Sequence, residues 1–268
     1  FLKKDKHGNY YYLVGKSDTA FTSHLDTASR TKSVVNLREF EKDGQTFIKT
    51  DGTSILGADD KAGVTVLLYM IHNNVPGVYW FFIGEERGGI GSRDVANDLN
   101  SYSFMKDVKK VVSFDRRNYY SVITSQMGVS CCSNEIAQSL CGEINKSGLK
   151  LTLDPTGVFT DSASFIDLIP ECTNVSVGYF DEHTHKEMLN VSYLERLCEA
   201  SVMCDWNGMK ATRKLMEESE SYRKYKKLAN FLKKQVFYNF DAMRGEDDRF
   251  IYEMQRNTQC NFFSFINA

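Results

Sequence analysis

Histidine and acidic residues gather at five places in this chain. They are His24-Leu25-Asp26, Asp59-Asp60, Glu85-Glu86, Asp115 and the stretch His183-Thr184-His185-Lys186-Glu187. Two histidines and three carboxylates can hold two divalent metal ions when one carboxylate bridges the ions. Mixed nitrogen and oxygen ligation suits Zn²⁺, Co²⁺ or Mn²⁺, and the clustered carboxylates would repel one another without bound metal. The residue types therefore predict a two-metal centre.

Each of these stretches also has an ordinary structural explanation when it is taken alone. Aspartate is common at helix N-termini, where it caps free N–H groups, so Asp59-Asp60 could simply begin a helix. A histidine near an aspartate is often a hydrogen-bonded surface pair, and adjacent glutamates such as Glu85-Glu86 are usually solvated. The joint occurrence of these stretches at the ends of predicted strands favours one shared site.

Alternating strands and helices must position these residues. Apolar runs predict strands at 10–14, 19–23, 46–50, 78–83, 108–114, 122–124 and 174–178. Helices are predicted at 64–71, 90–99, 134–145 and 190–206, with a short one that ends at Ile166, while 28–43 are expected to be irregular. This order predicts an α/β fold with a mixed, largely parallel sheet. Ligands of such sheets bind at the carboxyl ends of the strands, where His24, Glu85, Glu86 and Asp115 fall.

The character of the chain changes after Trp206, where Lys and Arg become frequent. Apolar residues then recur at the spacing of an amphipathic helix: Tyr222, Tyr225, Leu228, Leu232 and Val236. We therefore expect a catalytic domain over residues 1–206 and a helical extension over 207–268. The apolar stripe of the extension must be buried, either on the catalytic domain or on a second copy of the chain in a homo-oligomer.

Composition excludes several classes of protein. The 268 residues are 42% hydrophobic and 25% charged, with a net charge of −2, which argues against a general nucleic-acid binder or a membrane-surface protein. No apolar run approaches the roughly 18 residues of a membrane span. The seven cysteines contain no CxxC pair, so we expect reduced, mostly buried thiols. Together with the lack of a signal-peptide pattern, these features predict a cytoplasmic protein with no nucleic-acid or membrane partner.

The motif set resembles that of the co-catalytic di-zinc exopeptidases, which include peptidase T, the carboxypeptidase and aminoacylase group, and the zinc aminopeptidases. The stretch Gly57-Ala58-Asp59-Asp60-Lys61-Ala62-Gly63 is similar to the bridging-aspartate motif of peptidase T. The segment from Phe159 to Phe165, followed by Ile169-Pro170, is similar to the one that precedes the last metal ligand of the aminopeptidases. The resemblance covers residues 8–205 and implies a three-layer sandwich.

The resemblance also implies a role for each residue of the motif set. The metal ligands would be His24, Asp59, Glu86, Asp115 and His183, with Asp59 bridging two divalent ions, most simply zinc. Asp26 would orient His24, and Glu85 would act as the general base. His183 is favoured over His185 because the ligand histidine of the family directly precedes Thr or Ser, and an acid follows three residues after that Thr or Ser. The peptide bond between Asp59 and Asp60 is expected to be cis.

Two further expectations concern the surroundings of the site. Many relatives of peptidase T carry a lid domain between the counterparts of Asp115 and His183, but predicted core elements fill this interval here, so we expect a lidless form. Arg116, Arg117 and Asp161 are candidate substrate-binding residues. The guanidinium groups of the two arginines could bind a substrate carboxylate. Ordinary surface arginines would explain the first two residues equally well.

Three functions agree with these residues. The first is a metal-dependent hydrolase that cleaves amide bonds of short peptides, most simply an aminopeptidase. The second is a deacylase of N-acyl amino acids, which would use the same ligand set. The third is a non-catalytic binding protein with a degenerate site. Such a protein should lack the general base or a ligand, and none is missing from this sequence, which favours an enzyme whose substrate is a short peptide or an N-acyl amino acid.

Overall fold

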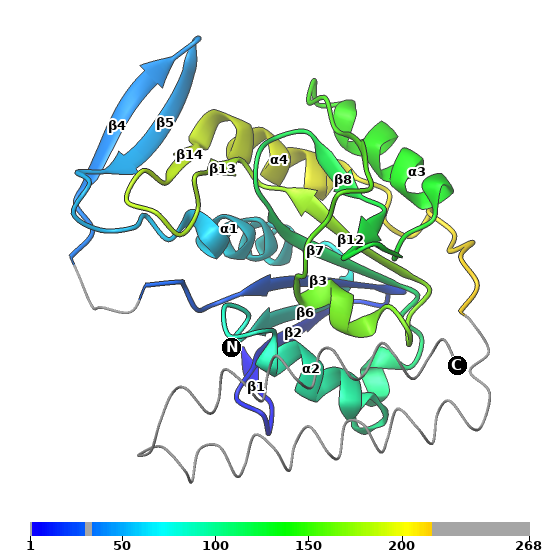
Figure 1. The fold of residues 1–268 in the computed structure, drawn as a ribbon. Coiled ribbons are helices and arrows are strands. Elements are labelled where there is room, and N and C mark those ends of the chain that lie inside the picture. The colour runs from blue at the N-terminus through cyan, green and yellow to red at the C-terminus, as the bar shows by residue number, and fades with distance from the viewer. Residues whose placement is uncertain (1, 30–33, 216–268) are drawn as a thin grey trace, which may run out of the picture. The chain divides into compact units, whose positions relative to one another are not determined.

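A mixed eight-stranded sheet forms the centre of the computed structural model, which describes residues 2–29 and 34–215 (Figure 1). The strand order is β1-β2-β6-β3-β7-β12-β8-β11. The strands are β1 (Lys3–Lys4), β2 (Tyr10–Val14), β3 (Thr19–His24), β6 (Gly77–Phe82), β7 (Lys110–Arg116), β8 (Ser121–Ile123), β11 (Thr152–Asp154) and β12 (Glu171–Ser176). The central strands β6, β3, β7 and β12 run parallel, which confirms the predicted mixed, largely parallel sheet.

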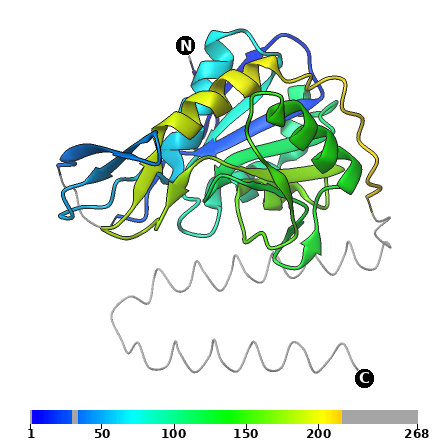
Figure 2. The same cartoon turned by 90° about the horizontal axis from the view of Figure 1, so that it is seen from above.

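Helices cover both faces of this sheet. They are α1 (Ala58–His72), α2 (Ile90–Asn97), α3 (Asn134–Asn145) and α4 (Val191–Met203), with short 3-10 helices η1 (Leu99–Ser101), η2 (Ser103–Met105) and η3 (Asp161–Phe165). Figures 1 and 2 show α1 and α4 on one face and α2 on the other. Strands β3, β6 and β12 are buried along their whole length because both faces are covered. The chain is therefore the three-layer sandwich that the resemblance implied.

A smaller sheet projects from the main body. Its order is β13-β14-β5-β4, with β13 (Tyr179–Phe180), β14 (Met188–Asn190), β5 (Gln45–Thr50) and β4 (Leu37–Lys42). A separate two-stranded ribbon joins β9 (Ser125–Gln126) to β10 (Val129–Ser130). Figure 1 shows β4 and β5 as a hairpin that extends away from the main sheet.

The expectation that residues 28–43 are irregular was wrong over strand β4. The strand pairs with β5 along its whole length, and Asp43 and Gly44 make the connecting turn with φ angles of 51° and 71°. Phe40 stacks on Phe47 across the pair at 5.5 Å between ring centroids. Apart from Phe40, which is half-buried, every residue of β4 is exposed, so the strand lacks the apolar alternation that would have predicted it.

Residues 116–182 form no separate lid domain; all of them are described by the structure. Strands β8, β11 and β12 from this interval join the main sheet, and α3 packs against α4. The interval between Asp115 and His183 is therefore filled by the core of the domain, as the lidless expectation required.

The segment that follows α4 belongs to the same compact unit, which ends at Leu215. Residues 209–215 are irregular rather than helical, in contrast to the expected helix. The buried Lys110 Nζ donates a hydrogen bond to the Met209 carbonyl at 2.7 Å. The backbone N–H groups of Thr212 and Arg213 donate to Glu171 Oε1 at 2.9 and 2.8 Å. The remainder of the predicted helical extension, with its stripe at 222–236, lies outside the described residues and stays a prediction.

Two expectations about the surface and the thiols can be compared with the described residues. No described helix is long and apolar enough to cross a membrane. The six cysteines in this part of the chain are free and buried, as expected for reduced thiols; Cys260 lies outside the described residues.

Candidate active site

The carboxyl ends of three neighbouring strands carry the predicted site residues. His24 ends β3, Glu85 and Glu86 follow β6, and Asp115 lies near the end of β7. In the parallel register His24 lies opposite Phe82 of β6, so these strand ends meet at one edge of the sheet. Helix α1 brings Asp59 to the same edge, and the loop between β13 and β14 brings His183.

Asp59 lies between the two histidines, with one carboxylate oxygen facing each ring. His24 Nε2 is 3.0 Å from Asp59 Oδ1, and His183 Nε2 is 3.0 Å from Asp59 Oδ2. Beyond the histidines lie Asp115, with Oδ1 at 3.7 Å from His24 Nε2, and Glu86, with Oε1 at 3.0 Å from His183 Nε2. The five predicted ligands therefore form two pairs, His24 with Asp115 and His183 with Glu86, and Asp59 lies between the pairs.

Asp26 supports the site differently from the role expected for it. His24 Nδ1 lies 2.9 Å from the main-chain carbonyl of Asp26, whereas the Asp26 carboxylate is 3.7 Å away. A carbonyl only accepts hydrogen bonds, so Nδ1 carries the proton and Nε2 presents its lone pair to a ligand. The Asp26 carboxylate instead accepts the backbone N–H groups of Gly84, Glu85 and Glu86 at 2.7, 3.1 and 3.2 Å. It thus holds the turn that carries both glutamates.

The start of α1 is shaped by Asp60 and Gly63. The peptide bond between Asp59 and Asp60 is cis, as expected. Asp60 Oδ2 accepts the backbone N–H of His24 at 3.2 Å, and its Oδ1 accepts the N–H of Gly63 at 3.0 Å. A Cβ on Gly63 would lie 1.9 Å from the Phe114 carbonyl oxygen. Only glycine lets α1 approach β7 so closely at this point.

Thr160 and Tyr179 hold Asp115, and sequence reasoning identified neither as a site residue. Thr160 Oγ1 donates to Asp115 Oδ2 at 2.6 Å, and the Tyr179 hydroxyl donates to Oδ1 at 3.1 Å. Thr160 belongs to the segment that resembles the aminopeptidases, so a sequence signal for it existed. Tyr179 had none, because its contact with Asp115 spans 64 positions of the chain.

The two histidines in the β13–β14 loop lie in different surroundings. His183 has a φ of 64°, in the left-handed region that few non-glycine residues occupy. This conformation accompanies the approach of its ring to Asp59 and Glu86. His185 is exposed, with Nδ1 at 3.0 Å from the Gly52 carbonyl oxygen. The preference for His183 over His185 agrees with this placement.

The clustered charges shift the pKa values of the site residues. Burial, with the charges of Asp115 and Asp161, raises the pKa of Glu85 to about 9. The hydrogen bond with Asp59 raises the pKa of His183 to about 9. Burial opposes ionisation of Asp59, but hydrogen bonds with the two histidines hold its pKa well below its usual range. In the absence of a cation, the ionised Asp59 therefore favours protonated histidines, and Glu85 favours its neutral form.

The donor set fits divalent cations. Single ligand atoms of His24, Asp59 and Glu86 lie within 4.8 Å of one another, as do those of His24, Asp60 and Asp115. Glu86 Oε1 is buried and accepts no hydrogen bond from the described residues, although His183 Nε2 lies 3.0 Å from it. A bound cation would satisfy this oxygen, which is otherwise costly to bury. Asp60 is the weaker candidate ligand, because both of its oxygens already accept backbone N–H groups.

The three candidate substrate-binding residues lie in different environments. The Arg116 guanidinium is buried and pairs with Asp154 of β11 at 3.3 Å. It therefore links β7 to β11 and is not accessible to a substrate. Arg117 is exposed and pairs with Glu182 at 3.1 Å. Asp161 is buried, and its Oδ1 has no hydrogen-bond partner among the described residues. Arg116 is the last residue of β7, whereas Arg117 lies in the bend that follows the strand, and the two side chains therefore have different surroundings.

Comparison with known sequences gives a short match. No family model matches the chain. A stretch of 91 residues is 37% identical to the uncharacterized protein YqjE of Bacillus subtilis, and it spans 31% of this chain and 23% of that protein. The match is therefore too short to define a family.

Solved structures match over a larger part of the chain. The aminopeptidase PepT of Bacillus cereus has a TM-score of 0.62 at 18% identity, with coverage of 78% of this chain and 89% of that one. A tripeptidase of Staphylococcus aureus covers the same shares at a TM-score of 0.58 and 18% identity. The chain has the aminopeptidase fold. The TET1 peptidase of Pyrococcus horikoshii shares this fold at a TM-score of 0.55 and 14% identity, with coverage of 76% and 89%. Within the aminopeptidase fold, the five predicted ligands lie at the carboxyl edge of the central sheet.

Proposed function

We propose that this chain is a two-metal hydrolase that cleaves the amide bonds of short peptides, most simply as an aminopeptidase. One observation carries the proposal: the two oxygens of Asp59 face His24 and His183 at 3.0 Å each. A carboxylate placed between two imidazoles, each backed by a further carboxylate, is suited to bridging two cations. The aminopeptidase fold supports the same class of reaction.

Each ion would have a defined set of protein ligands. His24, Asp115 and Asp59 would hold one ion, and His183, Glu86 and Asp59 would hold the other. Zinc is the first candidate, and the mixed donor set also suits cobalt or manganese. When bound, such ions lower the pKa of a coordinated water and polarise a carbonyl group.

Glu85 is the residue proposed to move the proton. Its backbone N–H is held by the Asp26 carboxylate, and its side chain is close enough to Asp115, Asp161 and His24 for their charges to shift its pKa. It would accept a proton from the attacking water and deliver it to the leaving nitrogen. Cations bound nearby would lower its pKa from the raised value and leave it ionised, as a general base must be.

The same donor set would serve a deacylase of N-acyl amino acids, so the substrate must be tested directly. The structural neighbours favour peptides, since two are described as an aminopeptidase and a tripeptidase. A neighbour is also described as assembling into a tetrahedron or a large octahedral shell, and we extend the expectation of a homo-oligomer to this chain on that ground.

A substrate panel tests the proposal. The full chain, loaded with Zn²⁺, Co²⁺ or Mn²⁺, is incubated with aminoacyl anilides, unblocked di- and tripeptides, and N-acyl amino acids. We expect turnover of unblocked peptides that is lost with a chelator and in Glu85→Gln. Turnover of N-acyl amino acids alone would replace the aminopeptidase with a deacylase. Full metal loading without turnover of any substrate would contradict an enzymatic function.

A further inference from the structure

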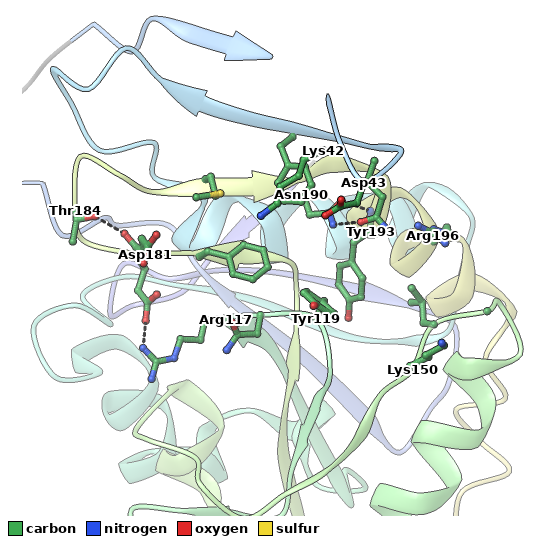
Figure 3. Close-up of a pocket in the computed structure, with 18 residues that line it drawn as sticks. Lys42, Asp43, Arg117, Tyr119, Lys150, Asp181, Thr184, Asn190, Tyr193 and Arg196 are labelled. Atoms are coloured by element: carbon green, nitrogen blue, oxygen red, sulfur yellow. Dashed lines mark hydrogen bonds and ion pairs between the residues drawn. The ribbon is translucent and has the colours of Figure 1, made fainter. Parts of the chain in front are cut away.

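A second feature of the molecule is a cavity of about 940 Å³ (Figure 3), and some of its lining residues are neighbours in sequence of the proposed metal ligands. It lies between the β4–β5 hairpin, the chain that follows β7, the β13–β14 loop and α4. Arg117 lines it two positions after Asp115, and Glu182 and Thr184, which flank His183, line it as well. Ligand pockets measure roughly 300–1,000 Å³, so this cavity has room for a short peptide that leads away from the site.

The lining changes in character along the cavity. The end next to His183 carries Arg117, which is neutralised by Glu182 at 3.1 Å. An aromatic wall follows, defined by Phe47, Tyr119, Phe180 and Tyr193. Tyr119 lies 5.7 Å from Phe180 and 6.1 Å from Tyr193 between ring centroids, and it is 49% exposed. The middle of the cavity therefore offers an accessible apolar surface.

The opposite end is basic. Figure 3 shows Lys150 and Arg196 on the side away from Thr184 and Asp181, and Lys42 of the hairpin also lines the cavity. None of these three cations forms an ion pair with a described residue. One acid, Asp43, lines the cavity on this side. The excess of cations is notable in a chain whose net charge is −2, because unpaired guanidinium and ammonium groups are suited to binding a carboxylate.

We propose that this cavity binds the leaving-group side of a short peptide and that Lys150 and Arg196 bind its C-terminal carboxylate. An apolar residue of the peptide would lie against the aromatic wall. The proposal rests on the proposed function, because the reacting amide bond must lie at the metal ligands for the rest of the peptide to reach the basic end. A free carboxylate is the one anionic group that every unmodified peptide carries, whereas an acidic side chain would supply the same chemistry only in some sequences.

Binding to the inactive Glu85→Gln variant tests the proposal without turnover. The zinc-loaded variant is titrated by calorimetry with three peptides: a tripeptide acid with a central phenylalanine, its C-terminal amide, and an amide that ends in glutamate. We expect the free acid to bind about tenfold more tightly than the plain amide. Lys150→Gln and Arg196→Gln should each remove most of that difference. Lys146→Gln, an exposed lysine paired with Glu143 outside the cavity lining, is the control and should preserve it.

The outcomes separate this proposal from the proposed function. Equal binding of acid and amide would overturn the carboxylate site, even if the wild-type chain hydrolyses peptides. Binding of the glutamate-ended amide as tightly as the free acid would also overturn it, in favour of an acidic side chain. If the wild-type chain hydrolyses no substrate but binds the free acid through Lys150 and Arg196, the enzymatic function fails and the carboxylate site stands. Failure of all three peptides to bind would overturn the carboxylate site.

Discussion

The Glu187 carboxylate accepts the backbone N–H of Asp59 at 3.0 Å, and its second oxygen accepts the N–H of Gly57 at 2.7 Å. Glu187 is 1% exposed and belongs to the same loop as His183. These bonds therefore join the loop that carries one proposed ligand to the start of the helix that carries the bridging one. The hydrogen bonds of Glu187 therefore help to fix the distance between Asp59 and His183.

We expect Glu187→Ala to weaken both folding and metal binding. The change leaves two buried N–H groups without an acceptor, at a cost of about 1–3 kcal/mol. Loss of a residue that orients metal ligands typically lowers metal affinity by roughly 10–100-fold. Glu187→Gln keeps one acceptor oxygen and should recover part of the affinity. Metal titration measures this effect, with the exposed Glu195→Gln as the control; unchanged affinity in Glu187→Ala would show a purely structural role.

Glu85 and Glu86 should separate turnover from metal binding. Glu85→Gln preserves shape but removes the proposed base, so it should retain two metal ions and lose roughly 10²–10⁴-fold in rate. Glu86→Gln should bind one ion more weakly and recover part of its activity at high metal concentration. Metal content and rate are measured together for both variants. If Glu85→Gln loses metal while Glu86→Gln binds two ions and is inactive, the two roles are reversed.

Gly63 should tolerate no side chain. A Cβ there would lie 1.9 Å from the Phe114 carbonyl oxygen, so Gly63→Ala must push α1 away from β7 and should cost about 1–3 kcal/mol or more. Gly142 in α3 is the matched control, because nothing lies within 4 Å of its added Cβ. Gly142→Ala should stabilise by about 0.4–1 kcal/mol. Chemical unfolding measures both changes, and a neutral Gly63→Ala would mean that the approach of α1 to β7 is looser than described.

The metal-free protein should lose stability as the pH rises toward 9. The folded state holds the Glu85 proton up to a pKa of about 9, whereas the ordinary value is 4.5. Between these values the unfolded chain binds fewer protons than the folded one, so raising the pH favours unfolding. The pKa of His183 is also raised, from 6.5 to about 9. Its contribution to stability is therefore fully present below pH 6.5 and is lost as the pH rises toward 9.

Thermal unfolding in a chelator between pH 5 and pH 9 measures this loss. Glu85→Gln should flatten the curve because it removes the carboxyl group, and it should be more stable than the parent at pH 8. His185→Gln, at an exposed position outside the site, is the control and should leave the slope unchanged. A stability that rises with pH over this range in the metal-free parent would contradict the direction of both shifts.

Two truncations should define the end of the folded unit. A chain that ends at Leu215 keeps the bonds from Lys110 to Met209 and from Thr212 and Arg213 to Glu171, and it should fold. A chain that ends at residue 206 removes these hydrogen bonds to the buried Lys110 and Glu171, and a hydrogen bond to a charged group contributes about 1.5–3 kcal/mol. Unfolding midpoints measure the difference. Equal stability of the two chains would place the end of the unit at 206.

Local patterns in the sequence predicted the main elements, and motifs in it suggested the proposed ligands. Strand β6 is a continuous apolar run because helices cover both faces of the sheet. Helix α3 matches its predicted range of 134–145, and Ser133 caps it with a side-chain oxygen that accepts the Ile136 N–H. The family resemblance implied the five proposed ligands. Three of them, His24, Glu86 and Asp115, also lie at strand ends, and parallel strands bring their carboxyl ends to one edge.

Only the tertiary structure decided how those residues are held and what lies beside them. The bonds of Glu187 to the Asp59 loop span about 130 positions, and the bond of Tyr179 to Asp115 spans 64. The direction of Arg116 toward Asp154 and the basic end of the cavity depend on segments that meet only after folding. Periodicity reports which face of an element is buried, but it carries no information on which distant residue lies against that face. For that reason the sequence could suggest the proposed ligands, whereas the residues that position them and the adjoining cavity could not be predicted from it.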